Sequence, residues 1–183
     1  RIGANLDEVA EAEGWLGAPQ PLLALLFAAG IVGESNQPDQ QTVRAFLEAR
    51  RGEALLSLVQ AWLDSSQFDE LRLLPSLQAE GDWSNDAVST LQRVLAILRS
   101  APPGQWWSLP VLLADVKANQ PDFQRPAGDY DSWYLREVES GEYLRGFAHW
   151  EAVDGALIGF IVEIMHWLGL LDLAGPGEGT RAY

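Results

Sequence analysis

The chain has 183 residues, 48% of them hydrophobic, so it can bury a substantial core and is not expected to be disordered. Its 12 basic and 26 acidic residues give a formal charge of −14, which repels phosphate backbones and anionic lipid at long range. The absence of cysteine excludes disulfides, thiolate metal sites and cysteine nucleophiles. No signal-like start or long apolar run is visible, which predicts a cytoplasmic protein that does not use a membrane. Because residue 1 is arginine, we expect a piece of a longer polypeptide.

The first part of the chain reads as a helix followed by a small hairpin. A short amphipathic helix is predicted over residues 6–15, and a second helix begins near Pro19 and stops at Gly30. Residues 31–32 resemble a strand, and residues 35–39 a turn. Residues 41–43 are then expected to return as a second strand.

The same order recurs at the other end of the chain. A long apolar helix is predicted over residues 150–168, followed by a strand at 170–173. The glycine-rich residues 175–179 form a turn, and residues 180–183 would return as the second strand. Two copies of one supersecondary unit indicate two related modules.

Between these copies the pattern is mainly helical. A helical turn is expected at residues 68–73, and Asn85 or Asp86 caps a regular amphipathic helix. Residues 106–108 look like a short strand, and residues 109–119 like a helix with proline in its first turn.

The expected fold is mainly α-helical with small β-hairpins, arranged as tandem winged-helix units joined by helices. Residues 1–48 form a partial winged-helix unit, and residues 49–84 a helical linker with an irregular segment. Residues 85–183 form a second winged-helix unit with a long insertion at about residues 120–147.

A resemblance extends over roughly residues 42–173. The stretch PDFQRPAGDYDSWYLREVESGEYLRGFAHW, followed by VDGALIGFIVEIMHWLGLLDL, resembles large bacterial proteins described as helicase-associated or as carrying winged-helix DNA-binding domains. AWLDSSQFDELRLLP and GDWSNDAV belong to the same likeness. The resemblance implies a module of a larger protein that acts near nucleic-acid transactions, and it supplies no catalytic residues.

The charges argue against ordinary DNA binding. A winged helix normally reads DNA with the helix before its wing, yet residues 150–168 contain no lysine or arginine. The only tight basic group is Arg44, Arg50 and Arg51. It is either a solvated helix end or a weak phosphate-contacting patch, whose binding would disappear at modest salt.

The chain shows no pattern of residues that indicates catalysis or a cofactor. His149 and His166 are too far apart on one helix to share a metal ion, and the glycine-rich tail lacks the lysine of a phosphate-binding loop. The acidic group in the insertion does not have the spacing of a calcium loop, and it reads as solvated charge. We therefore expect no catalytic residue, no metal and no cofactor. The acidic group comprises Asp129, Asp131, Glu137, Glu139 and Glu142.

Aromatic residues are the distinctive content of the insertion. Tyr130, Trp133, Tyr134 and Tyr143 either anchor the insertion to its own domain or form a candidate interaction surface. The chain's eight tryptophans are interpreted as large core residues, because they are spread along the chain without basic neighbours. The helix at 150–168 is apolar all round, which predicts burial on nearly every face.

These observations favour a non-catalytic winged-helix module of a larger bacterial protein that acts in protein interaction or scaffolding. Its partner would be another protein or another domain of the same chain. The alternative is a DNA-binding winged-helix domain of a helicase-associated or regulatory protein. A third hypothesis is an enzyme whose site lies in the acidic and aromatic insertion.

Overall fold

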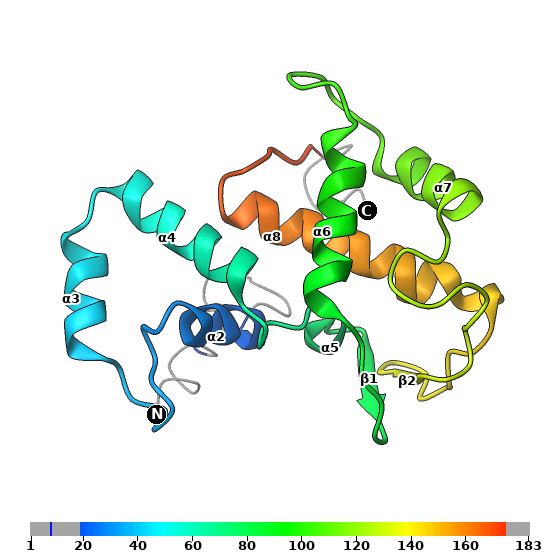
Figure 1. The fold of residues 1–183 in the computed structure, drawn as a ribbon, viewed down its shortest axis with the longest axis horizontal. Helices are drawn as coiled ribbons and strands as arrows, with labels where there is room; N and C mark the ends of the chain where they lie inside the picture. Colours follow the sequence, from blue (N-terminus) through cyan, green and yellow to red (C-terminus); the bar gives the residue numbers. More distant parts are fainter. Residues whose placement is uncertain (1–7, 9–18, 175–183) are drawn as a thin grey trace. The chain divides into compact units, whose positions relative to one another are not determined.

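The computed structural model describes residue 8 and residues 19–174, and the chain divides into two compact units, Arg1–Asp69 and Glu70–Tyr183. Described residues of both units are mainly helical (Figure 1), and a two-stranded antiparallel sheet lies in the second unit. The division between the two units falls inside residues 49–84, the segment predicted to be a linker. The predicted domain boundaries at residues 48 and 84 are not tested by it. The expected helix at 6–15, all but residue 8, and the final turn and strand at 175–183 lie outside the described residues.

In the first unit, α2 (Pro19–Ala28) is followed by a single antiparallel bridge between Val32 and Pro38. Gly30 adopts a left-handed φ of 66° and lets the chain leave the helix. The strand expected at 41–43 is wrong, because these residues belong to α3 (Gln40–Glu48). Asp39 caps this helix by accepting a hydrogen bond of 2.8 Å from the backbone N–H of Thr42.

Helix α4 (Arg51–Asp64) begins shortly after α3 ends. Its first turn is closed by Glu53, whose carboxylate accepts a 3.1 Å hydrogen bond from the backbone N–H of Arg50. The buried side chains of α4 are Val59 and Trp62, which leaves most of the remaining surface of the helix at least partly accessible.

The second unit begins with the short helix α5 (Glu70–Leu73), which confirms the predicted helical turn. Asp86 caps α6 (Ala87–Arg99) by accepting from the backbone N–H of Ser89 at 3.0 Å, as the sequence predicts. Helix α7 (Leu109–Asn119) also has the predicted bounds.

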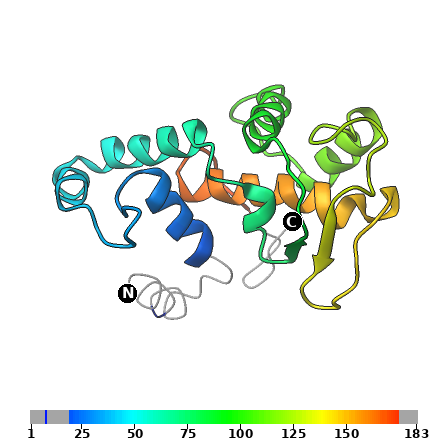
Figure 2. The same ribbon diagram turned by 60° about the horizontal axis from the view of Figure 1, so that its bottom comes forward.

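The sheet of the second unit pairs β1 (Leu77–Glu80) with β2 (Tyr134–Glu137), which joins the irregular segment before α6 to the insertion. Figure 2 shows that the insertion between α7 and α8 is otherwise irregular. The strands expected at 106–108 and 170–173 are wrong. After α8, Gly169 turns the chain with a φ of 71°, and the N–H of Leu170 bonds back to the carbonyl of Met165. The winged-helix arrangement is not confirmed.

The core of the second unit is built on α8 (Ala156–Trp167), which follows a 3-10 turn, η1 (Phe147–His149), and a π-helical turn, η2 (Glu151–Gly155). Leu157 to Val162 are six consecutive buried residues, so every face of this part of the helix is covered. The predicted all-round burial is therefore confirmed for α8. Only its end is open, where His166 and Trp167 are exposed.

The tryptophans do not behave alike. Trp62, Trp133 and Trp150 are buried, as expected of large core residues. Trp106, Trp107 and Trp167 are 73%, 48% and 44% exposed, so the core interpretation is wrong for them. The first two lie in the loop between α6 and α7, and the third is the last residue of α8, so none of them lies in the middle of a packed helix.

No helix among the described residues is long and apolar enough to cross a bilayer. Within the same residues, no group of three or more histidine, aspartate and glutamate side chains could hold a metal ion.

Candidate functional site

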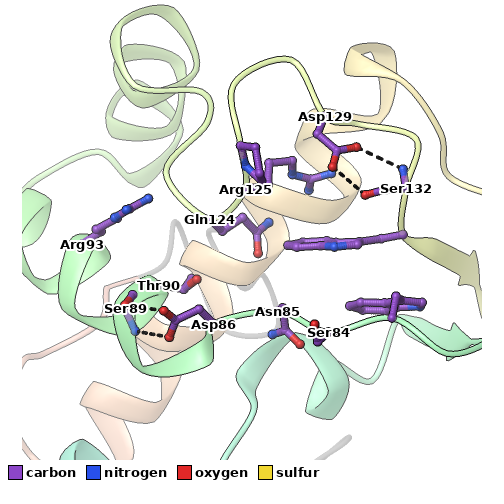
Figure 3. Close-up of a pocket in the computed structure, with 13 residues that line it drawn as sticks. Ser84, Asn85, Asp86, Ser89, Thr90, Arg93, Gln124, Arg125, Asp129 and Ser132 are labelled. Carbon is purple, nitrogen blue, oxygen red and sulfur yellow. Dashed lines mark hydrogen bonds between the residues drawn. The ribbon is translucent and has the colours of Figure 1, made fainter.

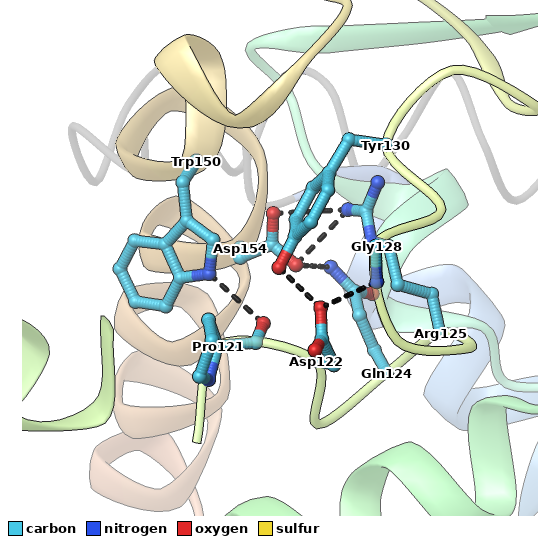
Figure 4. Close-up of polar contacts among 8 residues, drawn as sticks. All are labelled: Pro121, Asp122, Gln124, Arg125, Gly128, Tyr130, Trp150 and Asp154. Carbon is cyan, nitrogen blue, oxygen red and sulfur yellow. Dashed lines mark hydrogen bonds and ion pairs between the residues drawn. The ribbon is translucent and has the colours of Figure 1, made fainter. Parts of the chain in front are cut away.

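A buried ion pair fixes the insertion to the core. Arg125 donates from Nη2 to both carboxylate oxygens of Asp154, at 3.0 and 2.9 Å, and Gln124 donates to Oδ1 at 2.7 Å (Figure 4). All three side chains are buried, and Asp154 is only 1% exposed. A buried charge is tolerated when it is paired and hydrogen-bonded, so these contacts hold the start of the insertion against η2.

The π-helical turn sets the position of this carboxylate. Val153, Asp154 and Gly155 are consecutive and all buried, so the wider turn directs adjacent residues inward. Trp150, just before the turn, donates from its indole N–H to the carbonyl of Pro121 at 3.0 Å. The turn and the first residues of the insertion are therefore joined by both neutral and charged hydrogen bonds.

The two ionisable groups at this anchor have shifted pKa values. Burial raises the pKa of Asp154, while the positive charge of Arg125 and the amide of Gln124 act in the opposite direction. Burial also raises the pKa of Tyr130, helped by the hydrogen bond that its hydroxyl donates to Asp122. Tyr130 therefore stays protonated and acts as a donor throughout the physiological range.

A stack of aromatic rings and guanidinium groups continues from the ion pair. The guanidinium of Arg125 lies 4.9 Å from the ring centroid of Tyr130 and 4.5 Å from that of Trp133. Trp133 stacks on Trp83 with a centroid distance of 5.1 Å and an interplanar angle of 17°. Arg72 lies 4.3 Å from the Trp83 ring. Such contacts add to the hydrophobic burial of the rings and tie the insertion to the segment around β1.

Beside this stack lies a polar pocket of about 630 Å³ (Figure 3). Its wall includes Asp86, which binds Ser89, and Asp129, which binds Ser132 through side-chain hydrogen bonds of 2.6 and 2.7 Å. Arg93, also at the wall, donates to the backbone carbonyl of Phe123 at 2.9 Å. These polar groups are therefore engaged in hydrogen bonds that stabilise the local structure of the pocket wall.

Trp83 and Trp133 line the pocket, but they offer no free ring face on which a ligand could stack, and the pocket wall has no nucleophile paired with a base. Trp83 lies between Arg72 and Trp133, and Trp133 lies between Trp83 and Arg125, so these contacts occupy the faces of both rings. A sugar or nucleobase that stacks would need one of these faces. Ser89 and Ser132 of the pocket wall are paired with carboxylates, and no histidine is among the residues that line the pocket, so the wall lacks the nucleophile and base arrangement of hydrolytic sites.

Other side chains of the insertion, which do not belong to the buried anchor, form an exposed surface of tyrosine and arginine residues. Tyr134 and Tyr143 are 46% and 43% exposed, and the guanidinium of Arg145 lies 4.6 and 5.7 Å from their ring centroids. The hydroxyl of Tyr143 donates to Glu80 at 2.6 Å and accepts from Arg136 at 2.8 Å. Four of these residues, Tyr134, Arg136, Tyr143 and Arg145, are called the tyrosine–arginine face below.

The four aromatic residues singled out from the sequence therefore occupy two different environments. Tyr130 is half-buried and Trp133 is 7% exposed, and both belong to the anchor. Tyr134 and Tyr143 belong to the tyrosine–arginine face. This division could not be recognised from the sequence, because β2 is only four residues long and shows too little alternation between buried and exposed positions.

The basic group from the sequence analysis lies in the first unit. Arg44 forms an exposed ion pair of 2.8 Å with Glu48, four residues later on α3. Arg50 and Arg51 are exposed where α4 begins. Arg50 also directly follows Ala49, the C-cap of α3, so the partial charges of the two helix ends act on it in opposite directions.

The ion pair between Arg125 and Asp154 was missed by the sequence analysis. Asp154 interrupts an apolar run, in the stretch AVDGALIGF, and a charge among so many hydrophobic residues needs a buried partner. That signal was present, but the partner lies 29 residues away in an irregular segment.

The acid response of Glu80 provides a testable consequence of the tyrosine–arginine face. The hydrogen bond from Tyr143 and the charge of Arg136 lower the pKa of Glu80 below its usual value. A lowered pKa in the folded state means that this contribution to stability is present above pH 4.5 and is lost as the pH falls through the folded pKa. We expect an NMR titration of the Glu80 carboxyl carbon to show the lowered pKa. In Tyr143→Phe, the midpoint should return towards the ordinary value, and an unchanged midpoint would contradict this assignment.

No protein-family model, curated protein or solved structure matches this chain. The resemblance to helicase-associated bacterial proteins therefore stays a prediction from the sequence.

Proposed function

We propose that this chain is a non-catalytic module that binds another protein, or another domain of its parent protein, through the tyrosine–arginine face. The observation that carries the proposal is the exposed pair of tyrosine rings with Arg145 beside both of them. Tyrosine and arginine are enriched at the energetic centres of protein interfaces, where they combine apolar area with hydrogen bonding.

The rigidity of the face supports the same proposal. Tyr143 is held by hydrogen bonds to Glu80 and Arg136, and Leu144 bonds back to the carbonyl of Leu135 on β2 at 2.9 Å. The buried ion pair and the aromatic stack also fix the insertion, which carries this face, to the core. A surface that is already ordered loses less conformational entropy when it binds a partner.

Arg145 adds a recognition element. No hydrogen bond or ion pair joins it to a carboxylate among residues 19–174, and its contacts are with aromatic rings. Its N–H groups are therefore available to pair with a carboxylate or carbonyl group of a partner. A relation to winged helices would fit such a role, but the proposal does not depend on it.

The test compares the chain with a variant that lacks the face. Immobilised wild-type chain and Tyr134→Ala/Tyr143→Ala should be incubated with a lysate of a bacterium that encodes the chain, followed by quantitative mass spectrometry. We expect at least one protein to be retained by the wild type and lost from the double variant. Leu47→Ala, a truncation of a 75% exposed side chain in the first unit, is the matched control. Equal retention by wild type and double variant would exclude this face.

The DNA-binding alternative is tested separately. With a charge of −14, we expect no sub-micromolar binding of labelled duplex, even at low salt. The fluorescence anisotropy of the labelled duplex should therefore change little as the protein is added up to micromolar concentrations. Tight binding that weakens steeply with added salt and with Arg50→Ala/Arg51→Ala would replace the interaction proposal by the DNA-binding one.

A further inference from the structure

The pocket beside the aromatic stack is lined in part by buried polar residues (Figure 3). Thr90, Gln124 and Arg125 line it and are 6%, 6% and 8% exposed, and they are called the polar floor below. They are three of the five buried polar or charged residues in the described part of the chain. Buried polar groups are ordinarily hydrogen-bonded, so the bonds made by this floor indicate what the pocket can bind.

Part of the hydrogen-bonding capacity of the polar floor is not used within the protein. Gln124 and Arg125 both donate to Asp154, through Nε2 and Nη2. The Nε–H of Arg125 is buried and has no hydrogen-bond partner among the residues that the structure describes. Within these residues, neither the hydroxyl of Thr90 nor the amide oxygen of Gln124 takes part in a hydrogen bond. The floor therefore offers a charged donor, a hydroxyl and a carbonyl oxygen.

Asp129 adds an ionised carboxylate to the pocket wall. Hydrogen bonds from Ser132 lower the pKa of Asp129, and the positive charge of Arg125 acts in the same direction, so the carboxylate is negative at neutral pH. Its two oxygens accept from the N–H and the hydroxyl of Ser132, at 3.2 and 2.7 Å. Each carboxylate oxygen can accept a further hydrogen bond. A cationic group of a ligand can therefore pair with Asp129, close to the guanidinium of Arg125.

The charges of the lining residues balance. Asp86 and Asp129 supply two negative charges, and Arg93 and Arg125 supply two positive ones. Asp154, which is bonded to Arg125, adds a further negative charge beside the pocket. An anion such as phosphate would be opposed by these carboxylates, and a ligand that stacks would find no free ring face. The wall is complementary to a small polar ligand that carries both charges and has no net charge.

We infer that this pocket binds a free α-amino acid with a polar side chain. The carboxylate of the ligand accepts from the Nε–H of Arg125, and its ammonium group donates to Asp129. These two ligand groups are separated by a single carbon atom, which suits a neighbouring guanidinium and carboxylate. The polar side chain of the ligand pairs with Thr90 and with the amide oxygen of Gln124.

The size and place of the pocket agree with this inference. Its volume of about 630 Å³ lies within the range of roughly 300–1,000 Å³ that is usual for ligand sites, and it leaves room for the side chain of an amino acid. No residue of the tyrosine–arginine face lines the pocket. The inference therefore does not depend on the proposed function.

The test uses the whole chain labelled with nitrogen-15, to which each of the standard amino acids is added separately. We expect at least one polar amino acid, at millimolar concentration, to shift the NMR signal of the Arg125 Nε–H group and the amide signals of the lining residues. The methyl ester of that amino acid lacks the carboxylate charge, and its N-acetyl derivative lacks the ammonium group. Each derivative should bind about tenfold more weakly or worse, because it loses a charged hydrogen bond.

Three variants connect the binding to the lining residues. Asp129→Asn keeps the shape of the side chain but removes its charge, and it should weaken binding about tenfold. Thr90→Val removes only the hydroxyl and should weaken binding about threefold to tenfold. Asp131→Asn is the matched control, because it removes the same charge from an exposed residue that does not line the pocket, and it should leave the affinity unchanged. The amide signals of α8 check that each variant keeps its fold.

Several results would overturn the inference. They are the absence of any shift of the Arg125 signal with amino acids, and binding of the two derivatives as tight as that of the parent amino acid. Wild-type affinity in Asp129→Asn, or binding of glucose or inorganic phosphate in place of amino acids, would also overturn it. If Asp129→Asn does not fold, the two derivatives decide the question on the wild-type chain. Each of these results leaves the proposed function intact, because that function is tested through Tyr134 and Tyr143.

Discussion

Replacing Arg125 with alanine is expected to destabilise the second unit by about 3–5 kcal/mol, because Asp154 would remain buried without its charged partner. The loss would exceed that of an ordinary surface ion pair, which contributes about 0–1 kcal/mol. The measurement is a urea titration followed through the amide NMR signals of α8, which report on the second unit alone.

A double-mutant cycle separates two contributions to this loss of stability: the cost of leaving Asp154 buried without a partner, and the net contribution of the ion pair itself. Arg125→Met removes the guanidinium, Asp154→Leu removes the buried carboxylate, and Arg125→Met/Asp154→Leu replaces the pair by apolar groups of similar size. We expect the double variant to be clearly more stable than Arg125→Met or Arg125→Ala, because no charge is left buried and unpaired. Equal instability of the two would show that the packing of the insertion, and not the ion pair, dominates.

The destabilisation caused by Arg125→Ala should depend on pH in a defined direction. Burial raises the pKa of Asp154, so the folded state takes up this proton more readily than the unfolded chain does. Removing Arg125 removes an influence that lowers the same pKa. The penalty of Arg125→Ala should therefore shrink as the pH falls through the folded pKa, because a neutral carboxyl does not need the guanidinium. A penalty that stays constant from neutral to acidic pH would contradict an ionised Asp154.

Local signals predicted the helices well. The capping residue Asp86 and the proline in the first turn of α7 mark helix starts through contacts within one turn, and they can be recognised without knowledge of the fold. The all-round burial of α8 was also predictable, because a helix without a polar face must be covered. These inferences require only the periodicity of a helix.

The sheet was not predictable by the same reasoning. β1 and β2 are four residues each and pair across more than fifty positions, so neither their partner nor their register is encoded in a nearby turn. The pattern of helix, glycine and apolar residues suggested wings instead. At both ends of the chain the glycine in fact terminates a helix through a left-handed conformation, a role that needs no following strand.

Hydrophobicity alone also could not separate anchoring residues from surface residues. Trp133 and Trp106 are the same amino acid in irregular segments, yet one is enclosed by Trp83 and Arg125 and the other is exposed. Their difference depends on which long-range neighbours reach each loop. Looking for basic residues close to each tryptophan in the sequence does not reveal the stack, because Arg72 and Arg125 come to it from different segments of the chain.

This contrast between a buried and an exposed tryptophan predicts a second large effect on stability. Trp133→Ala is expected to cost about 3–5 kcal/mol, the range for truncating a buried aromatic residue, because it opens a cavity between Trp83 and Arg125. Trp106→Ala, a matched truncation at a 73% exposed site, should change stability by about 0.5 kcal/mol or less. Urea titrations of the two variants, followed through the amide signals of α8, provide the comparison.

Trp133→Phe tests what the stack itself contributes. Phenylalanine keeps an aromatic face for Trp83 and for Arg125, so this variant should retain most of the stability that alanine loses. The near-ultraviolet circular dichroism of the stacked indoles should decrease in both variants, because each removes one partner of the pair. If phenylalanine proved as destabilising as alanine, the indole's full size would matter more than its stacking. In that case the insertion would be held mainly by close packing and by the ion pair at Asp154.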